Sequence, residues 1–263
     1  EHYYDPRSIY AVTFTNKAAR EMSDRLIGTM GKERGRKVRV STFHTLGLSI
    51  LKKHGKLIGL RPGFSIYDQK DSTQLMESLM ESDAGTIRLA LDRISTWKND
   101  LQSLDALRNA VLDPFESSLV ELYDRYQTQL LSYNAIDFDD LILLPLQLLQ
   151  KFPDVRYHWQ KEIRYLLVDE YQDTNMCQYE LVKLLIGDHH HLTVVGDDDQ
   201  SIYAWRGARP ENLHQLRVDF PNLTLIKLEQ NYRSTGHILK AANHVISLNP
   251  HLYEKALWST LGD

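Results

Sequence analysis

Two carboxylates stand directly after a short apolar segment in the second half of the sequence. The segment covers residues 165–168, and the carboxylates are Asp169 and Glu170. If the segment is a strand of an open parallel sheet, its carboxyl end faces the crevice where such sheets bind ligands. Carboxylate oxygens there suit Mg²⁺, and the neighbouring carboxylate can act as general base on a water. The structural alternative, favoured for such a pair taken alone, is that Asp169 caps the next turn.

A second apolar segment ends in the same way. Residues 192–195 lead into Gly196, the run Asp197–Asp199 and Gln200. Successive carboxylates repel each other and ordinarily lie in a solvated turn. Because this is the second acidic strand end in one predicted sheet, the pattern indicates a shared polar crevice. Gln200 could reach a phosphate or a catalytic water there.

Aromatic and cationic residues follow this polar turn. Tyr203 and Trp205 are two residues apart, and Arg206 comes next. Single-stranded nucleic acid is held by aromatic faces that stack on bases and by cations that track phosphates. The alternative is that both rings belong to the core, which is the better interpretation of the cluster alone.

Three strand-to-helix junctions carry further polar side chains. Arg233 lies in one of them, within residues 230–234, where its planar fork can face a phosphate. Residues 13–19 and 41–45 place hydroxyl groups before predicted helices, where free backbone N–H groups suit phosphate oxygens. The alternatives are an exposed surface arginine and ordinary helix caps.

The elements that must position these residues alternate between strand and helix at both ends of the chain. Strands are expected at 9–14, 38–41, 165–168, 192–195 and 223–228. Helices are expected at 16–30, 43–53, 176–186 and 234–248. Residues 71–162 show helical periodicity and almost no strand candidates. The predicted fold class is therefore α/β, a parallel sheet domain interrupted by an all-helical insertion.

Composition narrows the class of protein further. The 263 residues are 42% hydrophobic and 25% charged, as in ordinary globular proteins, and carry no apolar run long enough for a membrane span. A net charge of −4 disfavours a compact basic DNA-coating protein. The single cysteine, Cys177, excludes an internal disulfide and a cysteine-based zinc cluster. With no signal peptide at the start, we expect a cytoplasmic location without membrane partners.

Taken together, the segments resemble the superfamily 1 helicases of the UvrD/Rep type over nearly the whole chain. The resemblance rests on LLVDEYQDTN (166–175), VVGDDDQSIYAWRGA (194–208), KLEQNYRS (227–234), DFDDL (137–141) and residues 13–19 and 41–47. Residues 94–100 and 207–210 are closer to the Rep branch of that family than to the UvrD branch.

The resemblance implies an activity and a domain plan. The activity is ATP-dependent 3′-to-5′ movement on single-stranded DNA and unwinding at single-strand/duplex junctions, in replication or repair. The fold implied is a RecA-like 1A domain with a helical 1B insertion. The expected division is 1A at residues 1–55, 1B at 56–162, 1A again at 163–231 and the start of a truncated 2A domain at 232–263.

The resemblance also implies roles for single residues, with ATP and Mg²⁺ as cofactors. Asp169 would bind Mg²⁺, Glu170 would activate water, and Gln200 and Arg233 would contact the γ-phosphate. The residues that would contact DNA lie in three segments: Phe14, Thr15, Asn16, His44, Tyr203, Trp205 and Arg206.

One expected motif is absent from these 263 residues. The phosphate-gripping pattern G-x-x-x-x-G-K-[ST] does not occur, since Gly31-Lys32 is followed by Glu33 and Gly55-Lys56 by Leu57. We therefore expect an internal fragment of a helicase that does not turn over ATP alone. The alternatives are a UvrD/PcrA-like repair helicase, a RecB-like helicase–nuclease, a non-catalytic DNA-binding module derived from a helicase, and a metal-dependent metabolic enzyme.

Overall fold

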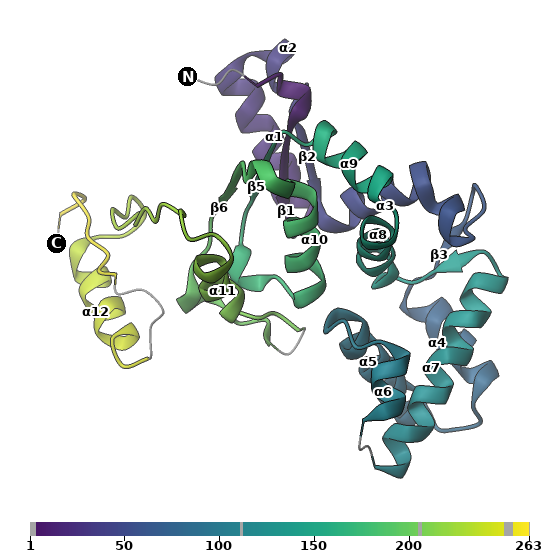
Figure 1. Cartoon of the computed structure of the whole chain (residues 1–263). Helices are drawn as coiled ribbons and strands as arrows, with labels where there is room; N and C mark the ends of the chain where they lie inside the picture. Colours follow the sequence, from purple (N-terminus) through teal and green to yellow (C-terminus); the bar gives the residue numbers. More distant parts are fainter. Residues whose placement is uncertain (1–3, 111–112, 205–206, 250–254, 263) are drawn as a thin grey trace.

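A four-stranded parallel sheet forms the centre of the molecule (Figure 1). The computed structural model describes residues 4–110, 113–204, 207–249 and 255–262. The strand order is β2-β1-β5-β6, and the strands are β1 (Ile9–Thr13), β2 (Arg39–Thr42), β5 (Tyr165–Val168) and β6 (Leu192–Val194). In the central pair, Val12 lies opposite Val168. The predicted α/β class with a parallel sheet is confirmed, and strands far apart in the sequence end at one edge.

The helices that follow these strands begin where the sequence predicts. They are α1 (Asn16–Met30), α3 (Phe43–His54) and α10 (Met176–Ile186), with the short α2 (Lys32–Gly35) after α1. The hydroxyls of Thr15 and Thr42 accept hydrogen bonds from the backbone N–H groups of Ala18 and Thr45. These side-chain caps satisfy N–H groups that have no partner within the helix.

Helices far from the sheet in sequence also belong to its core. These are α8 (Asp140–Lys151) and α9 (Pro153–Glu162), and they contact α3 and α10. Their close approach depends on Gly47 in α3, because a Cβ atom there would lie 1.8 Å from the backbone oxygen of Leu141. Leu146, Leu149 and Trp159 share one buried cluster with Val12 and Leu166 of the sheet.

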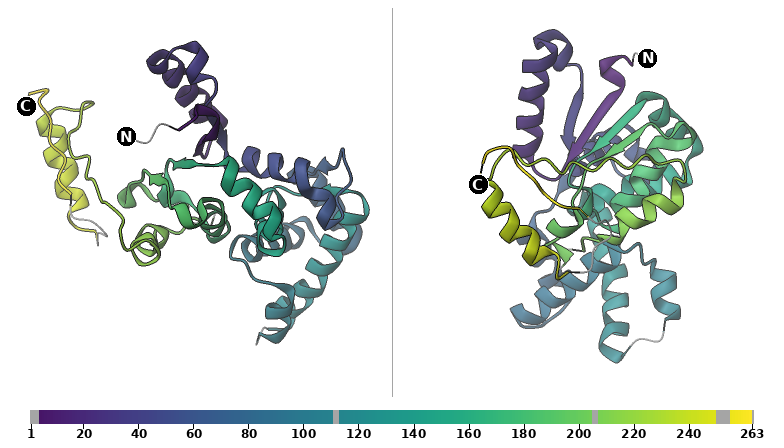
Figure 2. Two further views of the ribbon diagram at one scale, coloured as in Figure 1. Left: turned by 45° about the horizontal axis from the view of Figure 1, so that its top comes forward. Right: turned by 90° about the vertical axis from the view of Figure 1, so that its left-hand side faces the viewer.

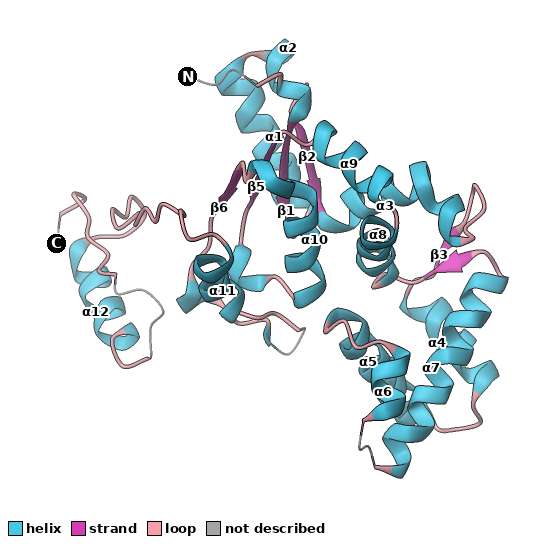
Figure 3. Ribbon diagram, viewed as in Figure 1, coloured by secondary structure: helices cyan, strands magenta, loops and turns pink. Residues whose placement is uncertain are grey.

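A separate group of helices lies beside the sheet domain (Figure 3), and its buried side chains form a hydrophobic core of their own. It contains α4 (Gln69–Leu79), α5 (Ala84–Asn99), α6 (Leu104–Asn109) and α7 (Pro114–Ser132), with a two-stranded parallel ladder of β3 (Ser65–Ile66) and β4 (Ala135–Ile136). Met76, Ile94 and Tyr126 lie at its centre. Since α8 and α9 pack with the sheet, we propose a narrower helical unit, near residues 65–136, than the expected range 56–162.

The C-terminal part of the chain departs from the expected pattern. Residues 223–228, expected as a strand, form none, and Ile226 and Leu228 are exposed. A strand needs a neighbour that accepts its ladder of hydrogen bonds, and no described segment pairs with these residues. The chain continues from α11 (Glu211–Asp219) to α12 (Gly236–Ile246), and α12 lies apart from the sheet (Figure 2). Within the described residues, no helix is both long and apolar enough to cross a membrane.

Candidate functional site

The carboxyl end of β5 presents the first pair of acids. The backbone N–H of Asp169 bonds the carbonyl of Val12 at 2.9 Å, so this residue stays in the sheet beside β1. Glu170 then takes a left-handed conformation with φ of +52°, and its side chain is exposed. Burial raises the pKa of Asp169, and the adjacent charge of Glu170 raises it further. Two neighbouring carboxylates in this setting form a site that favours a cation.

The buried side chain of Gln172 joins the acids after β5 to those after β6. Its amide nitrogen donates to Oε2 of Glu170 at 2.9 Å, and its Oε1 accepts from the backbone N–H of Asp197 at 3.0 Å. A Cβ atom at position 196 would lie 2.9 Å from that same Oε1, so Gly196 leaves room for the amide. Sequence reasoning missed Gln172, whose only signal is a glutamine two residues after an acidic pair.

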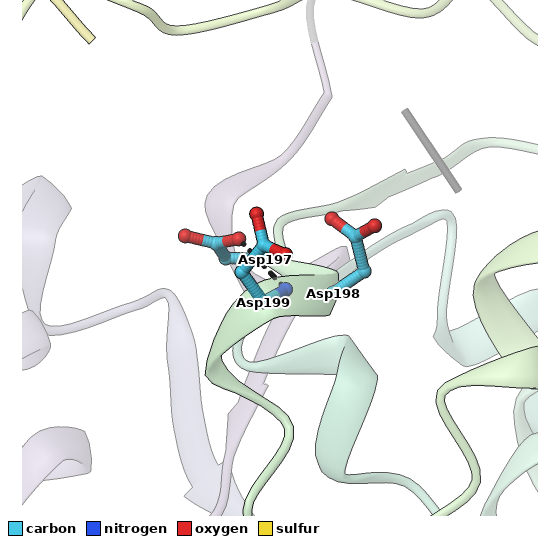
Figure 4. Close-up of side chains that lie close together, drawn as sticks. All are labelled: Asp197, Asp198 and Asp199. Carbon is cyan, nitrogen blue, oxygen red and sulfur yellow. Dashed lines mark hydrogen bonds between the residues drawn. The ribbon is translucent and has the colours of Figure 1, made fainter. Parts of the chain in front are cut away.

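The turn after β6 gathers three carboxylates (Figure 4). One carboxylate oxygen of each of Asp197, Asp198 and Asp199 lies within 4.8 Å of the others. Gln200 donates its amide to Oδ2 of Asp197 at 2.7 Å. We call Asp169, Glu170 and Asp197–Asp199 the acidic edge. The predicted neighbours Glu170 and Gln200 are thus linked through Gln172 and Asp197.

Lys255, from the C-terminal segment, lies against this turn. Its ammonium pairs with Asp198 at 2.7 Å, with Asp199 at 2.9 Å and also with Asp197. Burial acts to raise the pKa of Asp197, but the ion pair with Lys255 and the hydrogen bond from Gln200 outweigh it and lower that pKa. The lysine therefore already occupies the place where positive charge is most stabilised.

The donor set beside β5 fits a hard divalent cation. Mg²⁺ prefers oxygen ligands and retains several waters, so one or two carboxylates at an accessible edge suffice. Thr13 ends the neighbouring strand next to Asp169, and its buried hydroxyl has no hydrogen-bond partner in the described structure. Asp169 and Glu170 are the residues that could hold the ion.

Arg233 is not brought to the acidic edge. Its side chain is exposed, and within the described residues it makes no hydrogen bond or ion pair with Asp169, Glu170 or Gln200. The turn around it is fixed by Asn231, whose Oδ1 accepts from the backbone N–H groups of Arg233 and Ser234. The segment that carries Arg233 leads into α12, away from the sheet (Figure 1).

The candidate DNA contacts after β1 and β2 form a second, more apolar surface. Thr15 and Asn16 are exposed at the start of α1, and the half-buried ring of Phe14 packs edge-on against Phe43 at 5.8 Å. His44 is half-buried, and burial lowers the pKa of its imidazole.

Phe138 extends this surface and was missed by the sequence reasoning. Its ring is 53% exposed and lies edge-on to the ring of His44, with 6.0 Å between centroids. The position of this aromatic residue between Asp137 and Asp139 is the sequence signal that could have found it. Tyr203 is also exposed, at 41%, whereas Trp205 and Arg206 lie outside the described residues.

Comparisons with known proteins identify the family. Residues 1–221 match the UvrD/REP helicase N-terminal domain, so the chain belongs to that family.

Three curated relatives with different names are similar to nearly the whole chain. The ATP-dependent DNA helicase Rep of Escherichia coli (strain K12) is 52% identical over 263 residues, covering 98% of this chain and 39% of that protein. The ATP-dependent DNA helicase PcrA of Leuconostoc citreum is 43% identical, covering 98% of this chain and 35% of that protein. The ATP-dependent DNA helicase UvrD1 of Mycobacterium tuberculosis (strain CDC 1551 / Oshkosh) is 44% identical, covering 97% and 35%. The chain thus spans about two fifths of the length of these curated relatives.

Proposed function

We propose that this chain supplies part of the ATP- and DNA-contacting core of a DNA helicase that moves 3′-to-5′ on single-stranded DNA. The observation that carries the proposal is the link through Gln172, which ties the acidic ends of β5 and β6 into one site. Such a site at the carboxyl edge of a parallel sheet is where α/β proteins bind nucleotides. The names of the relatives, all ATP-dependent DNA helicases, support the same activity.

We assign the hydrolytic roles within the acidic edge as follows. Asp169 holds Mg²⁺, which neutralises charge on the phosphate oxygens when it is bound. Glu170 is the general base, since its exposed carboxylate can accept a proton from water and Gln172 fixes its orientation. Gln200 contacts the γ-phosphate, and we propose the same for Arg233 once the segment that carries it closes over the site.

The aromatic surface formed by Phe14, His44 and Phe138, with Tyr203, is assigned to single-stranded DNA. Stacking on an aromatic ring is tolerant of base sequence, as a translocating protein requires. A neutral His44 can stack or accept a hydrogen bond without adding charge. Thr15, Asn16, Trp205 and Arg206 are assigned to the same strand, the first two through exposed polar groups at the start of α1.

In the domain plan of the family, we assign the sheet with α1–α3 and α8–α11 to 1A, the helical unit to 1B and the residues from 232 onward to the start of 2A. We further propose that the protein acts in replication or repair at single-strand/duplex junctions, within the cytoplasm. The higher identity to Rep than to PcrA and UvrD1 favours a Rep-like role.

Glu170→Gln in the complete gene product tests the proposal. We expect ATP hydrolysis stimulated by single-stranded DNA to fall by about 10²- to 10⁴-fold, as for loss of a general base. Binding of a fluorescent oligonucleotide should be retained. The matched control is Glu81→Gln, which makes the same change at an exposed residue of the helical unit. Wild-type levels of hydrolysis in Glu170→Gln would contradict the assignment, and a wild-type protein that binds DNA without hydrolysing ATP would indicate a non-catalytic binding module.

The same assay compares ATP hydrolysis by this chain alone with hydrolysis by the complete gene product. We propose that the 263 residues alone do not turn over ATP, because they contain no G-x-x-x-x-G-K-[ST] loop for the β- and γ-phosphates. The expected result is hydrolysis by the complete gene product and none by the isolated chain. Robust hydrolysis by the isolated chain that Glu170→Gln abolishes would disprove this.

A further inference from the structure

A buried charge cluster lies where the helical unit meets the sheet domain. Lys98, near the end of α5, is fully buried and donates to Oδ2 of Asp137 at 2.7 Å and to Oδ1 of Asp140 at 2.9 Å. Tyr126 donates to Asp137, and Gln127 donates to Asp140. We call these residues the buried lysine cluster. They fix both ends of the loop 137–140, so the exposed ring of Phe138 is held between two anchored carboxylates.

The next residue, Asn99, connects this loop to the segment that follows the acidic pair. Its amide nitrogen donates to Oδ1 of Asp139 at 3.0 Å, and its Oδ1 accepts from the amide of Asn175 at 2.6 Å. Asn175 in turn caps α10, accepting from the backbone N–H of Gln178 at 2.8 Å. Residues 169–175 are thus held at one end by the sheet and at the other by this amide pair.

Residues 207–209 reach the same point. Gly207 has a φ of +86°, and a Cβ atom there would contact the Cβ atoms of Asn99 and Asn175 at 3.9 and 4.0 Å. Arg209 pairs with Asp100, the residue after Asn99, at 2.8 Å, and its backbone N–H bonds the carbonyl of Thr174 at 2.9 Å. Three segments therefore meet at Asn99: the loop 137–140, the end of residues 169–175, and residues 207–209.

We propose that Asn99 is a positioning residue that couples DNA contact at Phe138 and Tyr203 to the geometry of Glu170 and Gln172. This inference rests on the proposed function. Asn99 touches neither nucleotide nor DNA; it acts through Asp139 on one side and Asn175 on the other. Because each partner is held by further hydrogen bonds, a shift of the Phe138 loop on DNA binding is transmitted to residues 171–175.

The test is the stimulation factor, the ratio of kcat for ATP hydrolysis with saturating oligothymidylate to kcat without DNA, in the complete gene product. Asn99→Asp replaces the donor to Asp139 with a repelling carboxylate, and we expect the factor to fall roughly 2- to 30-fold. The KM for ATP without DNA should stay unchanged. Asn99→Ala removes the same hydrogen bonds without adding charge and should show the same loss, which guards against misfolding of the charged variant.

The double variant Asn99→Asp/Asp139→Asn supplies the rescue. It restores a donor and an acceptor between the two positions and leaves an oxygen at position 99 for the amide of Asn175, so the stimulation factor should return toward wild type. The matched control is Asn109→Asp on α6, where the amide donates to the carbonyl of Asp105 in its own helix and, among the described residues, to no other group. A change in stability alone would not lower the stimulation factor in the single variant and restore it in the double variant.

Two results would overturn the inference while leaving the proposed function intact. One is a stimulation factor in Asn99→Asp and Asn99→Ala equal to that of wild type. The other is a loss that the double variant does not reverse. A wild-type protein whose ATP hydrolysis does not respond to DNA at all would overturn the inference and the proposed function together.

Discussion

The acidic edge and the buried lysine cluster contain the same residue types in opposite settings. In the cluster, the side chains of Lys98 and Asp140 have no exposed surface, Tyr126 donates to the same oxygen of Asp137 as Lys98 does, and Gln127 donates to the second oxygen of Asp140. At the acidic edge, Glu170 is exposed and the positive charge comes from Lys255, in a distant part of the chain. The pair of Lys98 and Asp140 is sealed by the fold, whereas Glu170 at the acidic edge is accessible to an incoming cation.

The two settings separate carboxylates that stabilise the fold from carboxylates that can bind a ligand. Carboxylates removed from water need a partner within the fold, because an unpaired buried charge is strongly destabilising. Carboxylates at the ends of parallel strands remain partly hydrated and can exchange one cation for another. The cluster fixes the loop 137–140 and the edge binds ligand, while Asn99 and Asn175 lie between them. Four predictions test this contrast.

The largest expected effect is that of Lys98→Met. The substitution keeps the volume but leaves Asp137 and Asp140 without their buried cation, and we expect a loss of about 3–5 kcal/mol in the free energy of unfolding. Urea unfolding followed by circular dichroism measures it. Lys70→Met, at an exposed position of α4 in the same unit, is the control and should change little. A loss below about 1 kcal/mol for Lys98→Met would show that the cluster is not a sealed ion pair.

The second prediction concerns pH. Burial raises the pKa of Asp140 to about 6, with Asp137 adding to the shift and Lys98 opposing it. A group whose pKa is raised by folding contributes stability that is complete below its ordinary pKa of 3.8 and is lost as pH rises through about 6. Asp197, whose pKa is lowered, works in the opposite sense: its contribution is lost as pH falls below 3.8.

Unfolding free energies between pH 4 and 7 separate the two groups. The free energy of unfolding of the wild type should fall by a few kcal/mol at most as pH rises through the upper part of this range. This decrease should be absent in Asp140→Asn. Asp197→Asn should retain it and alter the profile only at lower pH. If Asp140→Asn keeps the wild-type slope, the buried carboxylate is not the titrating group.

Local patterns were sufficient to predict most of the sheet. The segments before Asn16 and Asp169 are apolar and short, with helix caps or acids immediately after them, and both are strands. Residues 223–228 have the same composition but form no strand, because pairing depends on a neighbour that local sequence does not encode. For the same reason, local sequence could not place α8 and α9: the expected helical range 56–162 includes them, whereas their packing with the sheet supports the narrower helical unit that we propose.

The candidate site was predicted unevenly for a related reason. Asp169, Glu170 and Gln200 could be found because strand ends concentrate at one edge of a parallel sheet. Gln172, Lys98 and Asn99 could not, since their roles depend on hydrogen bonds to residues far away in the sequence. Arg233 fits the motif but lies with α12, and no spacing rule predicts where that segment packs.

Gly47→Ala tests whether the buried lysine cluster depends on the close packing of α8 against α3. The added methyl group would collide with the backbone of Leu141, next to Asp140, and a backbone atom cannot rotate aside. We expect a loss of about 1–3 kcal/mol in unfolding free energy. Gly28→Ala is the matched control, because a Cβ atom at that position in α1 meets nothing within 4 Å. The control should be neutral or slightly stabilising. If Gly47→Ala is no more destabilising than Gly28→Ala, α3 and α8 can separate at little cost in free energy.

The smallest expected effect, and the most direct contrast with Lys98→Met, is that of Lys255→Met. Removing this lysine leaves Asp197–Asp199 without their ammonium partner, but water and metal ions can reach a turn in which the side chain of Asp197 is 35% exposed. We expect a loss of about 1 kcal/mol without divalent cations, and millimolar Mg²⁺ should restore most of it. Thermal unfolding of both lysine variants with EDTA and with Mg²⁺ measures this. Mg²⁺ should not restore Lys98→Met, because the ion cannot reach the position of a lysine whose side chain, like that of Asp140, has no exposed surface. Equal recovery of both variants, or of neither, would remove the distinction between the two groups of carboxylates.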